Sequence, residues 1–556
     1  MAKLALIGID GATYDLIRPM VERGELPHIA RLLREGASGD LESATPPITP
    51  PAWVSMMTGL NPGKHGIYNF MKRSRGSYGL ELVDSSLFAG SDIFSVLGSR
   101  GWSTGAFSVP MTYPPFPVNG YMISGIPMPM EGDGLAWPPE TMGQLGKFLG
   151  KDYEPDINYA KYDGKNEPES ENLDRYDEIR DELFRVEHER IDLMVEWIRR
   201  NPTDFWFGVL SITDRCQHYF WKFQDRTHDG WSEEGERRFG KVIRDSYRLS
   251  DEALGRFVEV LGADCTIAMA SDHGFGPFSS DFYLNRWLEE KGYLAFHKTP
   301  RWTVGVATLE YVLHLLKLGV VAGMLPKFLK RIPFVRPKYR RVRDARDIDW
   351  SRTRAFACLY GVCLNKVGRE PKGIVSPGPE EDALLNEISK ALSDLTGPDN
   401  DQPIVQRVEV STDLYSGEYV DMAPDIQFMA MDLSCLPKED LQAEETFARR
   451  RFAAVSGTHR MNGVFAVKGA GVLAGKVFSG MHIQDTMPTL LHALQEEIPA
   501  WMEGTVAIDA FQPDWLQQHY PRQSVEPATL LGQAENSWAA EDAAKVEESL
   551  KGLGYL

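Results

Sequence analysis

Residues 4–11 read LALIGIDG, an apolar run followed by the carboxylate of Asp10, with glycines at positions 8 and 11. Its first six residues, Leu4–Ile9, are typical of a strand buried on both faces of a parallel sheet. Two further segments repeat the pattern, since Phe205–Leu210 and Thr266–Ala270 are each followed within a few residues by an aspartate. In open α/β sheets the ligand crevice lies outside the carboxyl ends of the strands. We therefore expect these acidic residues to converge at one edge of a sheet.

Short apolar runs alternate with helical patterns along the chain, and another strand is expected at Val464–Val467. This alternation predicts an α/β fold with a mostly parallel central sheet flanked by helices. The 556 residues are too many for one compact core without insertions. We expect a catalytic core in three parts, 1–125, 200–276 and 451–511, with an inserted loop and helical region at 126–199, a large insertion or cap at 277–450, and a C-terminal tail at 512–556.

The composition is that of a globular protein with excess acid: 43% hydrophobic, 25% charged and a net charge of −19. This charge argues against binding to a nucleic-acid polymer, because phosphate backbones are held mainly by Lys and Arg. The five cysteines are widely spaced and form no zinc-ribbon pattern, which favours reduced thiols. The first strand begins too close to Met1 to leave room for a signal peptide. Together these features predict a cytoplasmic protein.

Residues 304–325 form the longest apolar stretch, but polar residues spaced four and three apart interrupt it on one helical face. We interpret the stretch as an amphipathic helix rather than a membrane span. Residues 326–346 then carry nine Lys or Arg against one acidic residue, Asp344. An apolar helix beside a basic cluster is the composition of an interfacial anchor, so 304–346 could contact a membrane surface. The alternative is a basic cap over the acidic body or over an anionic substrate.

Three aspartates and three histidines lie at predicted strand ends: Asp10, Asp214, His218, Asp272, His273 and His459. Asp214 and His218 are four residues apart, a spacing that presents both side chains to one ion on a helical turn. Asp272 and His273 are adjacent and are followed by a glycine that permits close approach. Carboxylate oxygens and imidazole nitrogens suit zinc, with manganese as a second choice. The six residues together predict a site for two divalent metal ions.

Each of these residues also has an ordinary structural interpretation. Asp10 could cap a helix at Tyr14–Glu22, because aspartate is a favoured N-cap. A lone Asp-x-x-x-His pair is common by chance, and an isolated residue such as His459 is often only a loop histidine. All six residues lie at predicted strand ends, and a purely structural role for every one of them at once is improbable.

Thr49 is the candidate nucleophile. It stands in residues 45–53, TPPITPPAW, just ahead of a predicted helix that ends at Gly59. Thr is a good helix cap and Pro is favoured in the first turn, so a purely structural role is the alternative. A helix N-terminus also attracts anions, which suits a hydroxyl that attacks an anionic substrate.

These motifs resemble the alkaline phosphatase superfamily and, within it, the type I phosphodiesterase/nucleotide pyrophosphatase branch. The likeness rests on residues 49–51, TPP, on residues 57–66, MTGLNPGKHG, and on the six acid and imidazole residues in the same order. The resemblance implies an alkaline-phosphatase-like core that hydrolyses phosphodiester or nucleotide pyrophosphate bonds through a phosphothreonine at Thr49. It also implies how the metal ligands divide. One ion would be held by Asp214, His218 and His459, and the other by Asp10, Asp272, His273 and the oxygen of Thr49.

The sequence departs from the family at the groups that hold the phosphate. Family members usually present an Asn three residues after the nucleophile and a backbone N–H directly after it, whereas this chain has Ala52 and Pro50. Neither residue supplies a donor. We nominate Arg215 and Lys64 as replacements, with solvated surface charges as the alternative for both.

Other activities of the superfamily are weighed on the same segment. A sulfatase needs a Cys or Ser in a Cys/Ser-x-Pro-x-Arg context, and cofactor-independent phosphoglycerate mutases use a Ser in a different motif; neither is present around Thr49. A phosphomonoesterase or phosphomutase of the superfamily stays open, because metal ligands do not distinguish monoesters from diesters. From another class, the chain could be a membrane-surface or scaffold protein with a vestigial metal site. We expect a small phosphorylated or nucleotide-like substrate.

Overall fold

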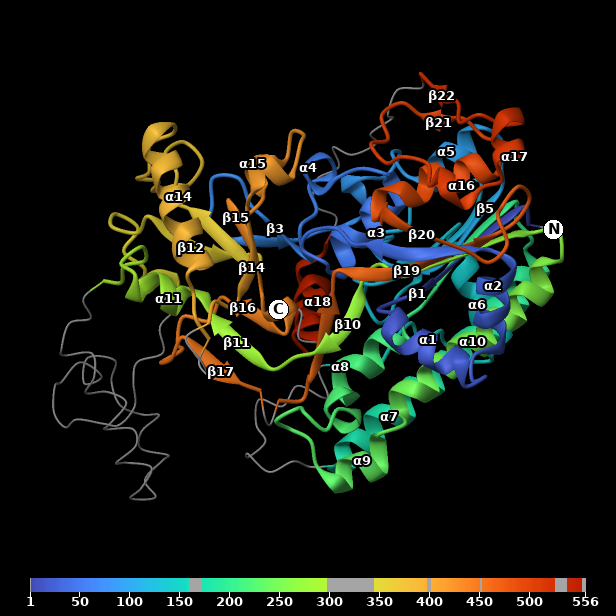
Figure 1. The fold of residues 1–556 in the computed structure, drawn as a ribbon, viewed down its shortest axis with the longest axis horizontal. Coiled ribbons are helices and arrows are strands. Elements are labelled where there is room, and N and C mark those ends of the chain that lie inside the picture. Colours follow the sequence, from blue (N-terminus) through green and yellow to red (C-terminus); the bar gives the residue numbers. More distant parts are fainter. Residues whose placement is uncertain are drawn as a thin grey trace.

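The computed structural model describes residues 2–157, 159, 173–297, 345–397, 402–450, 453–525 and 538–552. A nine-stranded sheet forms the centre of the molecule (Figure 1). Its strands, in spatial order, are β20 (Lys476–His482), β2 (Ala37–Glu42), β19 (Asn462–Lys468), β9 (Thr266–Ala270), β1 (Leu4–Ile9), β8 (Phe205–Leu210), β5 (Thr104–Val109), β6 (Gly120–Ser124) and β7 (Ala136–Trp137).

The sheet is mostly parallel, as predicted. β1 pairs in parallel with both β8 and β9, and the pairs β5–β8, β5–β6 and β2–β20 are also parallel. β19 runs antiparallel between β9 and β2, and β7 closes the far edge antiparallel to β6. The strands predicted at Leu4–Ile9, Phe205–Leu210 and Thr266–Ala270 are confirmed at those residues, and Val464–Val467 lies within β19. All residues of β1, β8 and β9 are buried, which explains their continuous apolar runs.

Helices cover both faces of this sheet. Alternate residues of β1 point to opposite faces and contribute to two separate apolar cores. Ala5, Ile7 and Ile9 pack into one apolar core, and Leu4 and Leu6 into another. The first core is covered by α1 (Tyr14–Glu22), α2 (Pro27–Glu35), α7 (Leu173–Arg200), α8 (Ile212–Gln224) and α10 (Val242–Leu261). The second is covered by α3 (Thr49–Thr58), α5 (Ile93–Ser99) and α16 (Thr486–Ala493). Figure 1 shows the two helical layers below and above the sheet.

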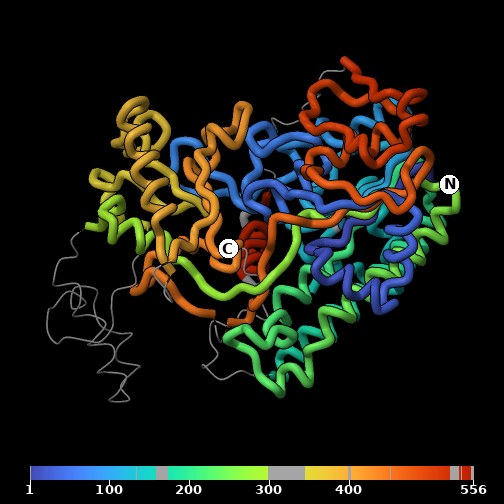
Figure 2. The backbone as a smooth tube through the Cα atoms, in the orientation of Figure 1, coloured from blue at the N-terminus to red at the C-terminus, as the bar shows by residue number. Residues whose placement is uncertain are grey.

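A second, seven-stranded sheet lies beside the first. Its strands are β12 (Ala355–Cys358), β13 (Gly361–Leu364), β14 (Val405–Val410), β15 (Ile426–Ala430), β16 (Cys435–Lys438), β11 (Ser280–Tyr283) and β17 (Phe447–Arg449). All of them fall within residues 277–450, the segment predicted as a large insertion or cap. Figure 2 shows residues of this segment, in yellow and orange, gathered on the side away from the N-terminus.

Shorter elements complete the fold. The remaining helices are α4 (Pro62–His65), α6 (Glu140–Leu149), α9 (Glu233–Phe239), α11 (Leu284–Glu290), α14 (Pro379–Ser393), α15 (Ser411–Leu414), α17 (Pro513–Gln518) and α18 (Ala540–Gly552). The remaining strands are paired as β3 (Met71–Arg73) with β4 (Leu80–Leu82), β10 (Gly274–Pro277) with β18 (Gly457–Arg460), and β21 (Ile498–Pro499) with β22 (Gln523–Ser524).

Three predictions from the sequence concern the cysteines, membrane-spanning helices and residues 304–346. The five cysteines are buried and free. Of the helices in the described residues, none has both the length and the apolar character that a membrane span requires. The amphipathic helix and basic segment predicted at 304–346 lie outside the described residues, apart from positions 345 and 346. Membrane contact through that segment stays a prediction.

Candidate metal centre

The carboxyl edge of the central sheet brings the predicted ligands together. Asp10 directly follows β1, Asp214 and His218 lie on α8 after β8, and Asp272 and His273 follow β9. Parallel neighbours end at the same edge, which is why residues up to 263 positions apart in the chain meet there.

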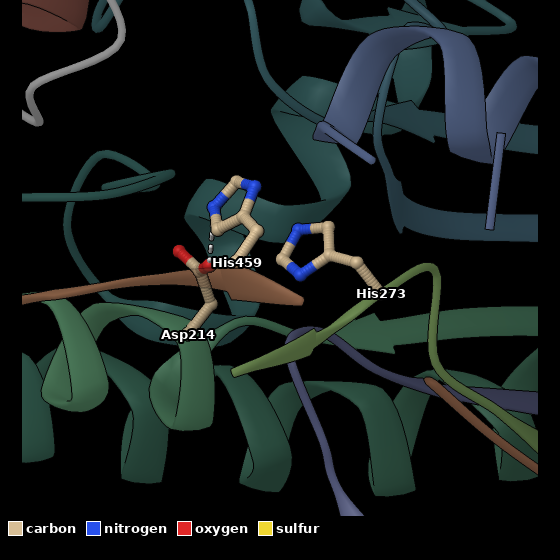
Figure 3. Close-up of side chains that lie close together, drawn as sticks. All are labelled: Asp214, His273 and His459. Carbon is tan, nitrogen blue, oxygen red and sulfur yellow. Dashed lines mark ion pairs between the residues drawn. The ribbon is translucent and has the colours of Figure 1, made fainter. Parts of the chain in front are cut away.

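His459 reaches the same place by a different route. It lies on β18, which pairs antiparallel with β10, and its register partner is Phe275. The chain between β9 and β10 carries His273, so the strand pair places the two imidazoles next to each other. Their rings stack with centroids 3.6 Å apart, and Figure 3 shows both beside Asp214.

The first group of ligand atoms consists of Asp214, His218 and His459. The two Nε2 atoms lie 3.2 Å apart, and Oδ1 of Asp214 is 3.4 Å from that of His218 and 3.6 Å from that of His459. Nδ1 of His218 donates to Gly457 O at 3.0 Å, and Nδ1 of His459 donates to Pro47 O at 2.9 Å. A neutral imidazole that donates from Nδ1 carries its lone pair on Nε2. The two lone pairs and the carboxylate therefore face a common point.

The second group consists of Asp10, Asp272 and His273. His273 Nε2 lies 3.1 Å from Asp272 Oδ2 and 3.7 Å from Asp10 Oδ1. These three atoms are buried and make no hydrogen bond with any described residue. Their companion atoms are engaged, since Asp10 Oδ2 accepts from Trp53 Nε1 at 3.2 Å and His273 Nδ1 donates to Gly274 O at 3.1 Å. Buried polar atoms are normally satisfied, so this set is arranged for a ligand that is not part of the chain.

The charges of the site also call for cations. Burial and the charge of Asp214 raise the pKa of Asp10 to about 8. Burial and the charges of Asp10 and Asp214 raise the pKa of Asp272 well above its ordinary value. Burial opposes ionisation of Asp214 as well, but His218 and Arg215 hold its pKa well below the usual range. Bound divalent cations would stabilise all three carboxylates, so donor types, burial and charge fit two such ions.

Asp214, His273 and His459 also offer ligand atoms within 4.8 Å of one another, as do Asp10, Asp272 and His273. His273 therefore lies between the two groups rather than in one alone. The division of ligands that the family resemblance implies, with His218 and His459 on one ion and His273 on the other, remains a prediction.

Thr49 is the first residue of α3, and the structure does not support a capping role for it. The N-cap is Ile48, and no side chain caps this helix. The side chain of Thr49 is 1% exposed, and its Oγ1 makes no hydrogen bond with any described residue. Asp10 is not a cap either, because α1 is capped by Thr13, whose side chain accepts from the N–H of Asp15.

The segment around Thr49 touches both groups of ligand atoms. Two residues before it, Pro47 O accepts the hydrogen bond from His459 of the first group. Four residues after it, one helical turn along α3, Trp53 donates to Asp10 of the second group. These two contacts fix the start of α3 against the two groups of candidate ligands, and Thr49 lies between the two contacts along the chain.

The start of α3 offers few backbone donors for an anion. Pro50 and Pro51 have no N–H, and the N–H of Ala52 donates to Ile48 O at 3.2 Å. At this position the folded chain therefore has neither the backbone N–H nor the Asn with which family members usually hold phosphate, as the sequence indicated.

The two residues nominated to hold phosphate have different surroundings. The side chain of Arg215 is 2% exposed, with Nη1 2.8 Å from Asp214 Oδ2 and Nη2 3.6 Å from Asp156 Oδ2. The alternative that Arg215 is a solvated surface charge is therefore wrong. Lys64 lies on α4, and its half-exposed ammonium group is 3.0 Å from Glu503 Oε1. Contact of either residue with phosphate stays a prediction.

Sequence reasoning missed the residues that support the ligands. Asp156 pairs with Arg215 and accepts from Tyr159 OH at 2.7 Å, although it comes from an irregular stretch with no motif. The position of Trp53 could have been predicted, because it lies four residues after Thr49, one helical turn along the predicted helix.

A cavity opens beside the first group of ligand atoms. His218 and His459 line it together with Pro46, Pro47 and Ile48, which precede the nucleophile, and with residues of the second sheet. Its cavity volume is about 50 Å³, and it is partly open to solvent. The second sheet therefore forms one wall of the space beside the first group of candidate ligands.

Comparison with known proteins gives one family match. Residues 4–349 match the family of type I phosphodiesterases/nucleotide pyrophosphatases, a range that includes Thr49 and five of the six acid and imidazole residues but not His459. No curated protein sequence matches the chain.

Similar solved structures include human ectonucleotide pyrophosphatase/phosphodiesterase 5, with 12% identity, 93% of this chain and 99% of that chain covered, and a TM-score of 0.47. An inactive variant of the murine protein, in complex with AMP, has 12% identity, 89% and 96% coverage, and a TM-score of 0.48. Phosphonoacetate hydrolase from Sinorhizobium meliloti, with phosphonoformate, has 14% identity, 87% and 94% coverage, and a TM-score of 0.47. Since the family match spans more than half of the 556 residues, the chain belongs to the type I phosphodiesterase/nucleotide pyrophosphatase family of the alkaline phosphatase superfamily.

Proposed function

We propose that the protein hydrolyses phosphodiester or nucleotide pyrophosphate bonds of small substrates at a two-metal site, with Thr49 as the nucleophile. One observation carries the proposal. Asp10 Oδ1, Asp272 Oδ2, His273 Nε2 and Thr49 Oγ1 are all buried and make no hydrogen bond with any described residue. Three unsatisfied ligand atoms, together with an unsatisfied hydroxyl on the segment that contacts the ligands through Pro47 and Trp53, support a metal-dependent phosphoryl transfer.

The residues would have the following roles. Asp214, His218 and His459 would hold one divalent ion, and Asp10, Asp272 and His273 the other. The mixed nitrogen and oxygen donors favour zinc, with manganese as the alternative. When bound, such ions stabilise the attacking and leaving oxygens of an in-line displacement. The carbonyls of Pro47 and Gly457 would orient the two imidazoles through their Nδ1 protons.

Thr49 would act through its side-chain oxygen. Oγ1 would bond to phosphorus as the ester oxygen leaves, and water would then hydrolyse the phosphothreonine and restore the hydroxyl. The contacts of Pro47 and Trp53 would hold Thr49 in place between the two groups of ligands. Because α3 lacks donors at Pro50 and Pro51, the phosphate oxygens would be held by other groups, for which Arg215 and Lys64 are our candidates.

Paired substrates test the proposal. Protein loaded with zinc or manganese should hydrolyse bis(p-nitrophenyl) phosphate with a higher kcat/KM than p-nitrophenyl phosphate, and chelation should abolish both activities. A strong preference for the monoester would instead assign the protein as a phosphomonoesterase of the same superfamily. Absence of turnover of either ester by the metal-loaded protein would contradict the proposed hydrolysis.

A further inference from the structure

The cavity beside His218 and His459 has an apolar lining. Its walls include Ile48, Phe278, Phe428, Leu433, Leu436 and Val455. Among the described residues, none that lines it is Asp, Glu, Lys, Arg, Asn or Gln. His218 and His459 of the first group of candidate ligands also line the cavity, and their Nδ1 atoms already donate hydrogen bonds to backbone carbonyls.

Such a lining discriminates between two kinds of phosphate ester. A nucleobase carries several ring nitrogens and exocyclic groups, for which the side chains of the lining other than the two histidines offer only the hydroxyls of Tyr360 and Thr458, so most of its hydrogen bonds to water would be lost, which is unfavourable. An alkyl or aryl group loses no hydrogen bonds and gains from the burial of its apolar surface. Resting on the proposed function, we infer that the preferred substrates are phosphate esters with an apolar alkyl or aryl substituent, which occupies this cavity, and that Tyr360 determines this specificity.

Tyr360 reaches the cavity from an unusual turn. Cys358 pairs with Gly361 across the β12–β13 hairpin, which leaves Leu359 and Tyr360 as its two-residue loop. Their φ angles are 50° and 65°, in the left-handed region that such turns normally fill with Asn or Gly. Bulky residues are rare there because the conformation is sterically unfavourable. The ring of Tyr360 is thus placed in the cavity wall at a conformational cost that an Asn-Gly turn would avoid.

The surrounding side chains hold this wall in position. The carboxylate of Glu439 accepts hydrogen bonds from the backbone N–H groups of Leu359 and Tyr360. Phe278, on another part of the wall, lies under the guanidinium of Arg450 at 4.1 Å, and Arg450 forms two bonds of 2.8 and 2.7 Å to Asp281. The wall is therefore largely formed before a substituent binds, which favours selectivity.

Binding of non-hydrolysable phosphonates tests the inference without relying on turnover. Isothermal titration calorimetry of the zinc-loaded protein would compare methyl-, butyl- and octylphosphonate with a nucleoside 5′-phosphonate. Each methylene that enters the cavity should tighten binding roughly fourfold. We expect octylphosphonate to bind at least about tenfold more tightly than methylphosphonate, as burial of only two methylenes would suffice, and more tightly than the nucleoside phosphonate.

Two variants of Tyr360 test whether its ring causes the preference for octylphosphonate over methylphosphonate. Tyr360→Asn suits the left-handed turn but removes the ring, so it should lower the octyl-to-methyl affinity ratio several-fold, whereas Tyr360→Phe should preserve the ratio. Tyr520→Asn makes the same change at a side chain that is 80% exposed and outside the cavity, and it should leave the ratio unchanged.

Several results would overturn the inference. Equal affinity for methyl- and octylphosphonate, or tighter binding of the nucleoside phosphonate, would refute the apolar preference while leaving the proposed hydrolysis intact. An octyl preference that persists in Tyr360→Asn would remove Tyr360 from the specificity. Absence of binding by every phosphonate, together with no turnover of bis(p-nitrophenyl) phosphate, would refute the proposed function and the inference with it.

Discussion

Replacement of Thr49 by valine separates a catalytic hydroxyl from a structural one. Valine has nearly the same shape but no hydroxyl. Because Oγ1 is buried without a hydrogen bond to any described residue, its removal breaks no bond and ends an uncompensated burial of a polar group. We expect the free energy of unfolding of the metal-free protein to rise by about 1 kcal/mol, at the lower end of the usual cost of such burial. A helix cap would instead lose roughly 0.5–2 kcal/mol.

The assay needs both stability and turnover. Urea unfolding of chelated protein would report the first, and hydrolysis of bis(p-nitrophenyl) phosphate by metal-loaded protein the second. Thr49→Val should abolish turnover, and Thr49→Ser should keep part of it. Thr58 is the matched control on the same helix, because its Oγ1 donates to Val54 O at 2.7 Å and accepts from the N–H of Leu60 at 3.2 Å.

The control should give the opposite outcome. Thr58→Val should lose roughly 1–3 kcal/mol of stability, because it leaves the buried N–H of Leu60 without the hydroxyl that it donates to, and should keep turnover of the folded protein. Wild-type turnover by folded, metal-loaded Thr49→Val would remove Thr49 from the mechanism. A loss of stability with turnover retained would restore the cap interpretation.

Two further predictions concern the buried charges. Arg215→Met should destabilise the metal-free protein by about 3–5 kcal/mol, because it leaves Asp214 and Asp156 buried without their cation, and should destabilise the metal-loaded protein less in thermal unfolding. The second prediction is a pH dependence of stability. The pKa of Asp10 is raised from 3.8 to about 8 in the folded protein. Near pH 7 the folded metal-free protein therefore keeps a proton on Asp10 that the unfolded chain has lost. Its free energy of unfolding should therefore fall between pH 7 and 8, by up to about 1.4 kcal/mol per pH unit for that proton, and bound metal should flatten the slope in urea titrations.

Controls make these two results decisive. Arg226→Met removes a guanidinium whose side chain is 73% exposed, and it should change stability little. An Arg215→Met protein as stable as wild type without metal would contradict the buried ion pair. The pH window lies above the ordinary pKa of histidine, and burial lowers the pKa of both His273 and His459, so these imidazoles are neutral in both states there. A metal-free protein whose stability rises from pH 7 to 8 would contradict the crowding of carboxylates around Asp10.

The strand ends and the site were predictable from the sequence for one physical reason. Runs such as Leu4–Ile9 and Thr266–Ala270 are buried on both faces, so they are apolar throughout and their ends are visible as the first acidic residue. Parallel strands then place those acids at a common edge, which accounts for the convergence of Asp10, Asp214 and Asp272.

Features that depend on contacts between distant segments could not be read in this way. The burial of Arg215 depends on Asp156, 59 residues away in an irregular stretch. The apolar cavity depends on a second sheet whose strands are short and come from segments spread between residues 280 and 449. The turn that contains Tyr360 could not be predicted, because two-residue hairpin loops of this type are recognised by Asn or Gly and not by Leu-Tyr.

Metal content measured alongside activity tests the central claim most directly. Elemental analysis of the purified protein should find about two zinc or manganese ions per chain, as expected of a two-metal site. His218→Ala should lose one ion from the first group and Asp272→Asn one from the second, and each variant should lose hydrolysis of bis(p-nitrophenyl) phosphate. Chelation of the wild type should abolish that hydrolysis, and added metal should restore it. Full hydrolytic activity in protein shown to contain no metal would contradict the account.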